Sequence, residues 1–363
     1  MKISEIIAHL EQWAPPALQE SYDNSGLLCG HPQQETTGCL VTLDVTEAVI
    51  EEAIRLGISF VVAHHPVVFS GIKKLTGRDW VQRTIIKAIK HDVAIYAIHT
   101  NLDHVHTGVN RRIGELLGLE KLQILDPKEQ TLLKMVVLAP RDVAPQVQAA
   151  MCEAGAGQIG AYKDCAFVST GEGFFRPTDE AQPTIGAHGQ LEKVEEQRIE
   201  VILPTWKKEA VLKAARAHHS YEEMAYYIQK LENTSADYGS GMMGVWQEPR
   251  TLEDTLEKIK STFGGVVRYT KNERGPIRKV AFCGGSGSFL LAKAKAEGAD
   301  LFLTADFKYH QFFDAEDQIV IADIGHFEIE QFTSQLIVDH LKQKFTTFAP
   351  QITTVNTNPV GYY

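Results

Sequence analysis

The sequence predicts an α/β fold with mainly parallel sheets, interrupted by an α+β insert of the ferredoxin-like type. Two observations lead to this fold class. Strands and helices alternate with short links in residues 1–126 and again in 236–363, which is typical of parallel sheets wound with helices. Residues 127–235 instead show the order βαββαβ, which is a complete unit. We therefore expect an outer domain in two halves, with the insert in one of its surface loops, where insertion is well tolerated.

The elements of the first half follow from hydrophobic periodicity and from cap residues. Apolar side chains from Ile3 to Trp13 lie on one helical stripe. Thr46 and Gly57 have the chemistry of a helix N-cap and C-cap. We expect helices at 3–13, 46–57, 79–91 and 108–119, a loop leading into a short strand within 21–30, and strands at 38–46, 58–65 and 93–103.

The rest of the chain is interpreted in the same way. In the insert we expect strands at 131–140, 165–177, 197–206 and 221–231, and helices at 141–155 and 207–219. The polar, glycine-containing segment 232–244 is expected to close the insert. In the second half we expect helices at 251–264 and 290–298, a strand leading into a glycine-rich turn within 278–289, and a strand leading into a polar loop within 299–310. We also expect a strand followed by a helix within 317–345, and an extended tail at 353–363.

Composition excludes several classes of protein. The formal net charge of -10 argues against a general nucleic-acid binder, which would show a basic face. No run of about 18 apolar residues is present, so we expect no membrane span, and the first helix lacks the apolar core of a signal peptide. The five cysteines are odd in number and form no CxxC pair. A reducing cytoplasm is therefore the expected location.

Two adjacent histidines, His64 and His65, follow a buried apolar run that ends at Ala63. On a regular strand their side chains would point to opposite faces, but Pro66 favours a departure from the strand. Both rings could then reach one cavity at the carboxyl end of the sheet, where open α/β sheets bind ligands. The pair is compatible either with a metal site or with two unrelated polar residues at a strand end.

Other predicted strand ends carry further polar side chains. In chain order these are Asp44, His99, Asp103, Asp306, His310, His326 and Glu330. His326 and Glu330 are four residues apart, so on a helix they share one face. Nitrogen and oxygen ligands of this kind suit Zn²⁺, Mn²⁺, Fe²⁺, Co²⁺ or Mg²⁺. Their number favours two ions about 3.5–4 Å apart, bridged by a carboxylate.

Each of these residues also has a structural interpretation. Asp103 could cap a turn, Glu330 could form a surface pair with His326, and His99 could be a hydrogen-bonded core histidine. The stretch from Cys283 to Phe289, CGGSGSF, follows a strand and precedes a helix, as a phosphate-binding loop would. It lacks the lysine of a Walker loop and the spacing of a dinucleotide fingerprint. A tight turn close to the metal ligands is the preferred interpretation.

Seven stretches occur in an order that resembles one known family. They are YDNSGLLCG, LDVTEAVIEEA, AHHPVVF, HTNLD, GGSGS, ADLFLTADFKYH and DIGHFEIE. Together they resemble the NIF-three-like family of di-metal proteins, whose members are often labelled GTP cyclohydrolase 1 type 2 homologues. The resemblance covers the two outer segments. The insert, with HHSYEEMAYYIQKL, is similar to the PII and CutA proteins.

The resemblance implies a fold, a site and an assembly. It implies a two-lobed α/β domain that forms a toroidal homohexamer with its metal sites facing an internal cavity. It implies that two divalent ions are held by His64, His65, Asp103, His326 and Glu330. His99 falls within a family motif, and we place it outside the direct ligands.

The ligand set leads to two hypotheses about function. The first is a metal-dependent hydrolase that uses a metal-bridged hydroxide on a nucleotide or another small molecule, either a cyclohydrolase or a phosphoesterase. Asp306, His310 and His99 are its candidates for proton transfer. The alternative is a non-catalytic metal-binding regulatory protein whose PII-like insert senses a ligand. Neither hypothesis includes a membrane, and nucleic acid is the least favoured partner.

Overall fold

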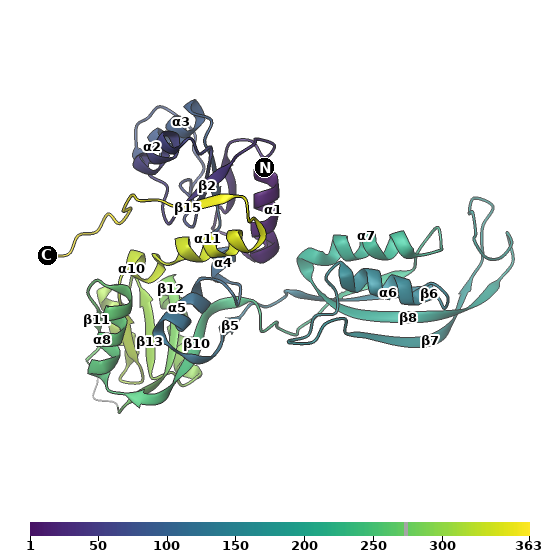
Figure 1. Ribbon diagram of the computed structural model, residues 1–363. Coiled ribbons are helices and arrows are strands. Elements are labelled where there is room, and N and C mark those ends of the chain that lie inside the picture. Colours follow the sequence, from purple (N-terminus) through teal and green to yellow (C-terminus); the bar gives the residue numbers. More distant parts are fainter. Residues whose placement is uncertain (272–274) are drawn as a thin grey trace. The chain divides into compact units, whose positions relative to one another are not determined.

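The computed structural model describes residues 1–271 and 275–363 (Figure 1). These residues divide into two compact units. The first unit combines Met1–Asp126 with Asp237–Tyr363, and the second is Pro127–Ala236. In the part of the chain that is described, no helix is long and apolar enough to cross a membrane.

The first sheet of the first unit has the strand order β1-β4-β3-β2-β15. Its strands are β1 (Gly26–Cys29), β2 (Gly38–Thr42), β3 (Phe60–Ala63), β4 (Ala94–Ala97) and β15 (Ala349–Ile352). All neighbouring pairs are parallel except β1 with β4. Every residue of β2, β3 and β4 is buried, as expected for parallel strands that are covered on both faces.

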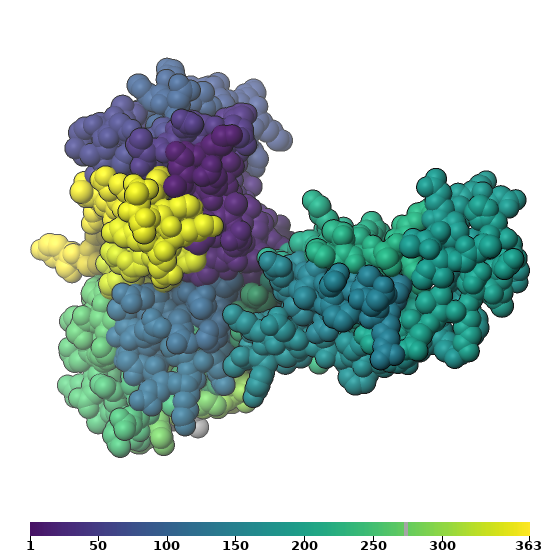
Figure 2. All heavy atoms as spheres, turned by 45° about the vertical axis from the view of Figure 1, so that its right-hand side comes forward, coloured from purple at the N-terminus to yellow at the C-terminus, as the bar shows by residue number. Residues whose placement is uncertain are grey.

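Helices cover this first sheet. α2 (Glu47–Leu56) and α3 (Trp80–Lys90) pack on one face. The predicted caps of α2 are present, since the Thr46 side chain accepts a hydrogen bond from the Val49 N–H and Gly57 adopts φ 67°. α1 (Ile3–Trp13) contacts α11 (Thr333–Lys344), and Figure 2 shows the yellow C-terminal residues against the purple N-terminal ones. The two ends of the chain thus build one lobe together.

The second sheet of the first unit has the order β11-β14-β13-β12-β10-β5. Its strands are β5 (Glu120–Pro127), β10 (Gly239–Arg250), β11 (Arg268–Tyr269), β12 (Ile277–Ser286), β13 (Leu301–Ala305) and β14 (Val320–Asp323). The helices of this lobe are α4 (Thr100–Asp103), α5 (Val109–Leu117), α8 (Leu252–Phe263), α9 (Leu291–Ala296) and α10 (His326–Glu330). β12, β13 and β14 are parallel, whereas β10 is antiparallel to β12 and β11 is antiparallel to β14. The first sheet is mainly parallel, and the second is mixed.

The second unit has the predicted ferredoxin-like fold. Its elements are β6 (Leu132–Pro140), α6 (Ala144–Glu153), β7 (Ala166–Phe175), β8 (Glu192–Pro204), α7 (Lys208–His218) and β9 (Tyr226–Lys230). The antiparallel order β7-β8-β6-β9 is that of a βαββαβ sandwich. Alternate residues of β6 and β8, such as Met135 and Ile199, form its core with Val147 and Val211 of the two helices. This unit therefore has a core of its own.

Several parts of the first unit differ from the sequence-based expectation. Residues 232–244 were expected to be a connection, but β10 begins at Gly239. The glycines of this segment suggested a loop. At Gly244, however, the glycine serves close packing within the strand, since a Cβ there would lie 2.8 Å from the Leu122 side chain. The strands β5, β11 and β15 were not predicted, and the strand expected at 93–103 ends at Ala97 and is followed by the short helix α4. The single helix expected after Gly325 is two helices, because residues 331–332 form a turn between α10 and α11.

Candidate metal centre

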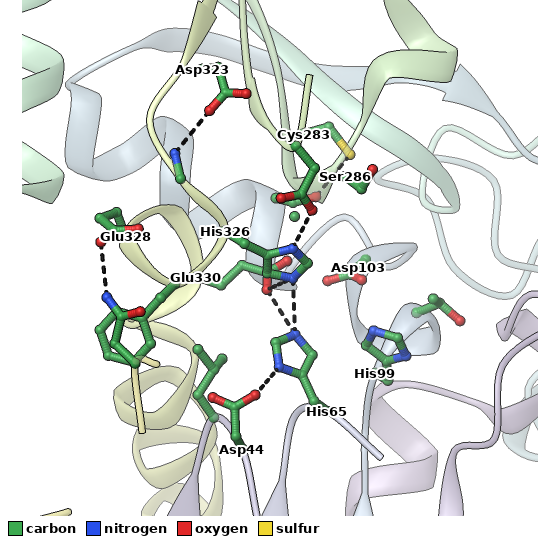
Figure 3. A pocket seen from close by; sticks show the side chains of 18 of the residues that line it. Asp44, His65, His99, Asp103, Cys283, Ser286, Asp323, His326, Glu328 and Glu330 are labelled. Carbon is green, nitrogen blue, oxygen red and sulfur yellow. Dashed lines mark hydrogen bonds and ion pairs between the residues drawn. The ribbon is translucent and has the colours of Figure 1, made fainter. Parts of the chain in front are cut away.

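A cavity of about 1330 Å³ lies in the first unit at the carboxyl ends of the parallel strands. It receives side chains from both halves of the chain, including His65 and His99 from the first and His326 and Glu330 from the second. Figure 3 shows these four side chains converging, together with Asp44 and Asp103. The predicted position at the end of the sheet is therefore where the polar side chains meet.

The paired histidines begin where β3 ends. The backbone N–H groups of His64 and His65 still donate to Thr42 and Leu43, at 3.1 and 2.9 Å. Beyond the strand the two rings no longer point to opposite faces, and their centroids are 4.9 Å apart. His64 is fully buried, whereas His65 lines the cavity. The departure from the strand expected before Pro66 thus places both rings on the same side.

Four histidines of the centre are oriented in the same way. In each ring Nδ1 meets an oxygen acceptor: Ile98 O for His64 (2.8 Å), Asp44 Oδ1 for His65 (2.8 Å), Asp23 Oδ1 for His99 (2.7 Å) and Asp306 Oδ2 for His326 (2.7 Å). An acceptor at Nδ1 favours the tautomer with its proton there, which leaves the lone pair of Nε2 free. Such partners are typical of histidines that bind metals.

Glu330 lies at the middle of this arrangement and is only 2% exposed. Its Oε2 is 3.0 Å from His65 Nε2 and 3.1 Å from His326 Nε2, and its Oε1 is 3.9 Å from His64 Nε2. The Nε2 atoms of His65 and His326 face each other at 3.3 Å. Because Glu330 presents one oxygen to each side, its position suits a carboxylate shared between two ions.

Three groups of possible ligand atoms result, each within 4.8 Å. They are His64, His65 and His99; His65, His326 and Glu330; and His64, Asp103 and Glu330. The structure thus brings together all five predicted ligands. It adds His99, which we had placed outside the direct ligands.

The donor set fits divalent ions. His64 Nε2 and Asp103 Oδ1 are buried without a hydrogen-bond partner, 3.6 Å apart. Leaving such groups unpaired is costly. The Nε2 atoms of His65 and His326, 3.3 Å apart, would also repel each other whether both carry lone pairs or both carry protons. A cation bound to these nitrogen and oxygen atoms would satisfy both arrangements.

The titration behaviour of the centre reflects these contacts. Burial raises the pKa of Asp103, and the charge of Glu330 raises it further. Burial alone would raise the pKa of Glu330, but the charge and hydrogen bond of His326 lower it well below the usual value. Burial would likewise lower the pKa of His65 and His326, but the surrounding carboxylates raise these values to about 9 and about 11.

The three candidates for proton transfer lie in different places. Asp306 lines the cavity and supports His326, and its φ of 61° is a left-handed conformation that few aspartates adopt. His99 lines the cavity and belongs to one of the three groups of possible ligand atoms. His310 is exposed, does not line the cavity and stacks on Phe313, with ring centroids 6.3 Å apart. His310 lies in a 3₁₀ helix, Tyr309–Ala315, which the sequence did not predict.

Two features of the centre concern residues outside the predicted ligands. Asp23, which lies in the loop before β1, accepts from His99 and from both the N–H and the hydroxyl of Thr100. Spacing offers no signal for this role, because Asp23 is distant from His99 in sequence. The glycine-rich stretch acts by close approach, since a Cβ at Gly285 would lie 2.7 Å from Glu330 Oε1. The expected closeness to the candidate ligands is present, but a tight turn is not, because β12 continues with an irregular register to Ser286.

Comparisons with known proteins agree with this fold. A model of the Duf34/NIF3 (NGG1p interacting factor 3) family matches residues 1–359. A GTP cyclohydrolase 1 type 2 homolog from Halalkalibacterium halodurans is 39% identical over 349 residues, covering 94% of each chain. One from Bacillus subtilis is 38% identical, covering 89% of this chain and 87% of its own. A solved Bacillus cereus protein related to NIF3 has a TM-score of 0.90 and 36% identity, covering 100% of this chain and 99% of its own. The chain therefore belongs to the Duf34/NIF3 family.

Proposed function

We propose that this protein is a hydrolase that depends on two divalent ions. The observation that supports the proposal is the position of Glu330 between two ligand groups at an accessible cavity. In this proposal His64, Asp103 and Glu330 hold one ion, and His65, His326 and Glu330 hold the other. Zn²⁺, Fe²⁺, Mn²⁺, Co²⁺ and Mg²⁺ are all compatible with such ligands. His99 lies beside the first group and could complete it or contact the substrate.

Bound ions would supply a water molecule of lowered pKa and stabilise negative charge on the substrate. The protein side chains have distinct tasks in this reaction. Asp44 and Asp306 hold the rings of His65 and His326 through Nδ1 and keep Nε2 directed at the ligand groups. The pKa of Asp306 is lowered mainly by its hydrogen bond with His326, so this carboxylate is ionised at neutral pH. We assign to Asp306 the acceptance of a proton from the attacking water.

A positive charge on the wall of the cavity favours an anionic substrate. Arg268 is the one lysine or arginine among the described residues that line it. Its guanidinium donates to the carboxylate of Asp323 and to the Phe307 carbonyl at 3.1 Å, and it lies 5.5 Å from the Phe312 ring centroid. The side chain remains 55% exposed. A fixed guanidinium next to a metal site is suited to a phosphate or carboxylate group.

The proposal is tested by activity that depends on metal. Protein stripped by a chelator and reloaded with each ion would be assayed on nucleoside triphosphates, phosphodiesters and cyclic amides. We expect turnover only after reloading, and none in Glu330→Gln. Two bound ions with no turnover on any of these substrates would contradict hydrolysis and favour the regulatory alternative. Equal turnover in both proteins would place the reaction elsewhere.

Arg268→Gln is expected to weaken binding of an anionic substrate while leaving kcat nearly unchanged. A hydrogen bond to a charged group contributes about 1.5–3 kcal/mol, so KM should rise by about 10-fold or more. Asp323 would keep its bonds from the Phe307 and Gly325 N–H groups, at 2.8 and 3.2 Å, which limits damage to the fold. Steady-state kinetics would measure the effect.

Arg250→Gln is the matched control for this prediction. Arg250 lies over the Trp246 ring, 5.0 Å from its centroid, and does not line the cavity. Its substitution should leave KM unchanged. An equal rise of KM in both variants would show that loss of positive charge at any position, and not contact with the substrate, explains the result.

A further inference from the structure

The last residues of the chain contribute to the wall of the metal-site cavity. β15 joins the first sheet, and the following Thr353 N–H donates to Val41 O at 2.9 Å. The hydroxyls of Thr353 and Thr354 then bind the buried carboxylate of Glu52. The final segment, drawn in yellow up to the C label in Figure 1, has no helix or strand, and Asn358 to Val360, Tyr362 and Tyr363 line the cavity.

The first link between this segment and the centre runs through Asp44. The Thr357 hydroxyl donates to Asp44 Oδ2 at 2.8 Å. The other carboxylate oxygen, Oδ1, is 2.8 Å from His65 Nδ1. Both oxygens of Asp44 are therefore engaged, one by the C-terminal segment and one by a candidate ligand. A carboxylate held at both oxygens fixes the plane of the His65 ring more firmly than one held at a single oxygen.

The second link runs through Glu328. This carboxylate belongs to α10, between the ligands His326 and Glu330, and is only 6% exposed. Its Oε1 accepts from Asn358 Nδ2 at 3.0 Å, and it also forms a hydrogen bond with the Tyr362 hydroxyl. The same short segment thus contacts both lobes of the cavity: the lobe that provides His65 and the lobe that provides the helical ligand pair.

We infer that residues 357–362, which we call the C-terminal strap, position the ligands of the second ion. In this role Thr357 acts on His65 through Asp44, and Asn358 and Tyr362 act on α10 through Glu328. The strap residues are positioning residues, since none of them belongs to the ligand groups. The inference rests on the proposed two-ion centre but is independent of whether the protein hydrolyses a substrate.

The test compares Co²⁺ binding in wild type, Thr357→Val and Thr357→Ser, measured by calorimetry and by the visible absorption of bound Co²⁺. Valine keeps the shape of threonine but removes the donor, whereas serine retains it. Loss of the group directly behind a metal-binding histidine weakens affinity by about 10–100-fold, and Thr357 acts one contact farther away through Asp44, so its loss should weaken affinity by about 10-fold. We expect a loss of this size for one of two ions in the valine variant, with an altered spectrum, and recovery in the serine variant.

Controls separate the possible failures. Thr262→Val removes a hydroxyl that donates to Lys258 O within α8, away from the cavity, and should bind as wild type does. The double variant Asn358→Ala/Tyr362→Phe tests the link to Glu328 and should weaken the same ion. Two ions of unchanged affinity and spectrum in Thr357→Val and in the double variant would overturn the role of the strap. Absence of ion binding in wild type would instead overturn the proposed centre.

Discussion

Glu330→Gln is expected to abolish tight binding of both ions, whereas loss of any unshared ligand should affect mainly one. The reason is that Glu330 belongs to two ligand groups and directs an oxygen to each. Removal of a group behind a ligand already weakens metal binding by about 10–100-fold, so removal of a shared ligand should exceed that. Metal content by mass spectrometry and affinity by calorimetry would measure the loss.

Glutamine has nearly the same shape as glutamate, so the variant should remain folded. Glu297→Gln serves as the control, because Glu297 is a partly exposed residue that pairs with Lys293 and does not line the cavity. Retention of two ions with unchanged affinity in Glu330→Gln would refute the assignment of this residue as a bridging ligand.

Metal uptake is expected to release protons, and affinity should rise steeply with pH. Burial alone would lower the pKa of both rings. Without bound ions, the neighbouring carboxylates outweigh burial and raise the pKa of His65 to about 9 and that of His326 to about 11. Both rings therefore carry an extra proton at pH 7, and an ion must displace it from each. Two displaced protons correspond to an increase of about 100-fold in affinity per pH unit below pH 9.

Calorimetry in buffers with different ionisation enthalpies would count the released protons. His65 and His326 should account for about two of them at pH 7. Their number should fall as the pH rises through the pKa of His65. An affinity that does not change between pH 6 and pH 8 would contradict this account of the centre.

The sequence contained enough information for much of the fold and for the five candidate ligands that the structure brings together. His326 and Glu330 were predictable because a spacing of four residues places them on one face of a helix, and they are within 3.1 Å at the nearest atoms. Buried apolar runs identified the parallel strands, and the βαββαβ order identified the insert. These signals are local, so one sequence is sufficient to detect them.

The partners of the ligands could not be predicted, because they depend on contacts between distant parts of the chain. Thr357 and Asp44 are 313 residues apart, and Asp23 and His99 are 76 apart. Asp306 was a candidate by its place after a strand, but its bond to His326 required the two strands to be neighbours. The homohexamer implied by the family resemblance remains a prediction, which light scattering would test.

The attachment of the insert has a consequence for how such chains can vary in length. The strands that lead into and out of it, β5 and β10, are neighbours in the same sheet. None of the residues that line the metal-site cavity comes from Pro127–Ala236. The chain therefore leaves and re-enters the first unit at the same edge of the second sheet. Evolution could lengthen, replace or delete everything between these strands and still transmit the complete ligand set unchanged.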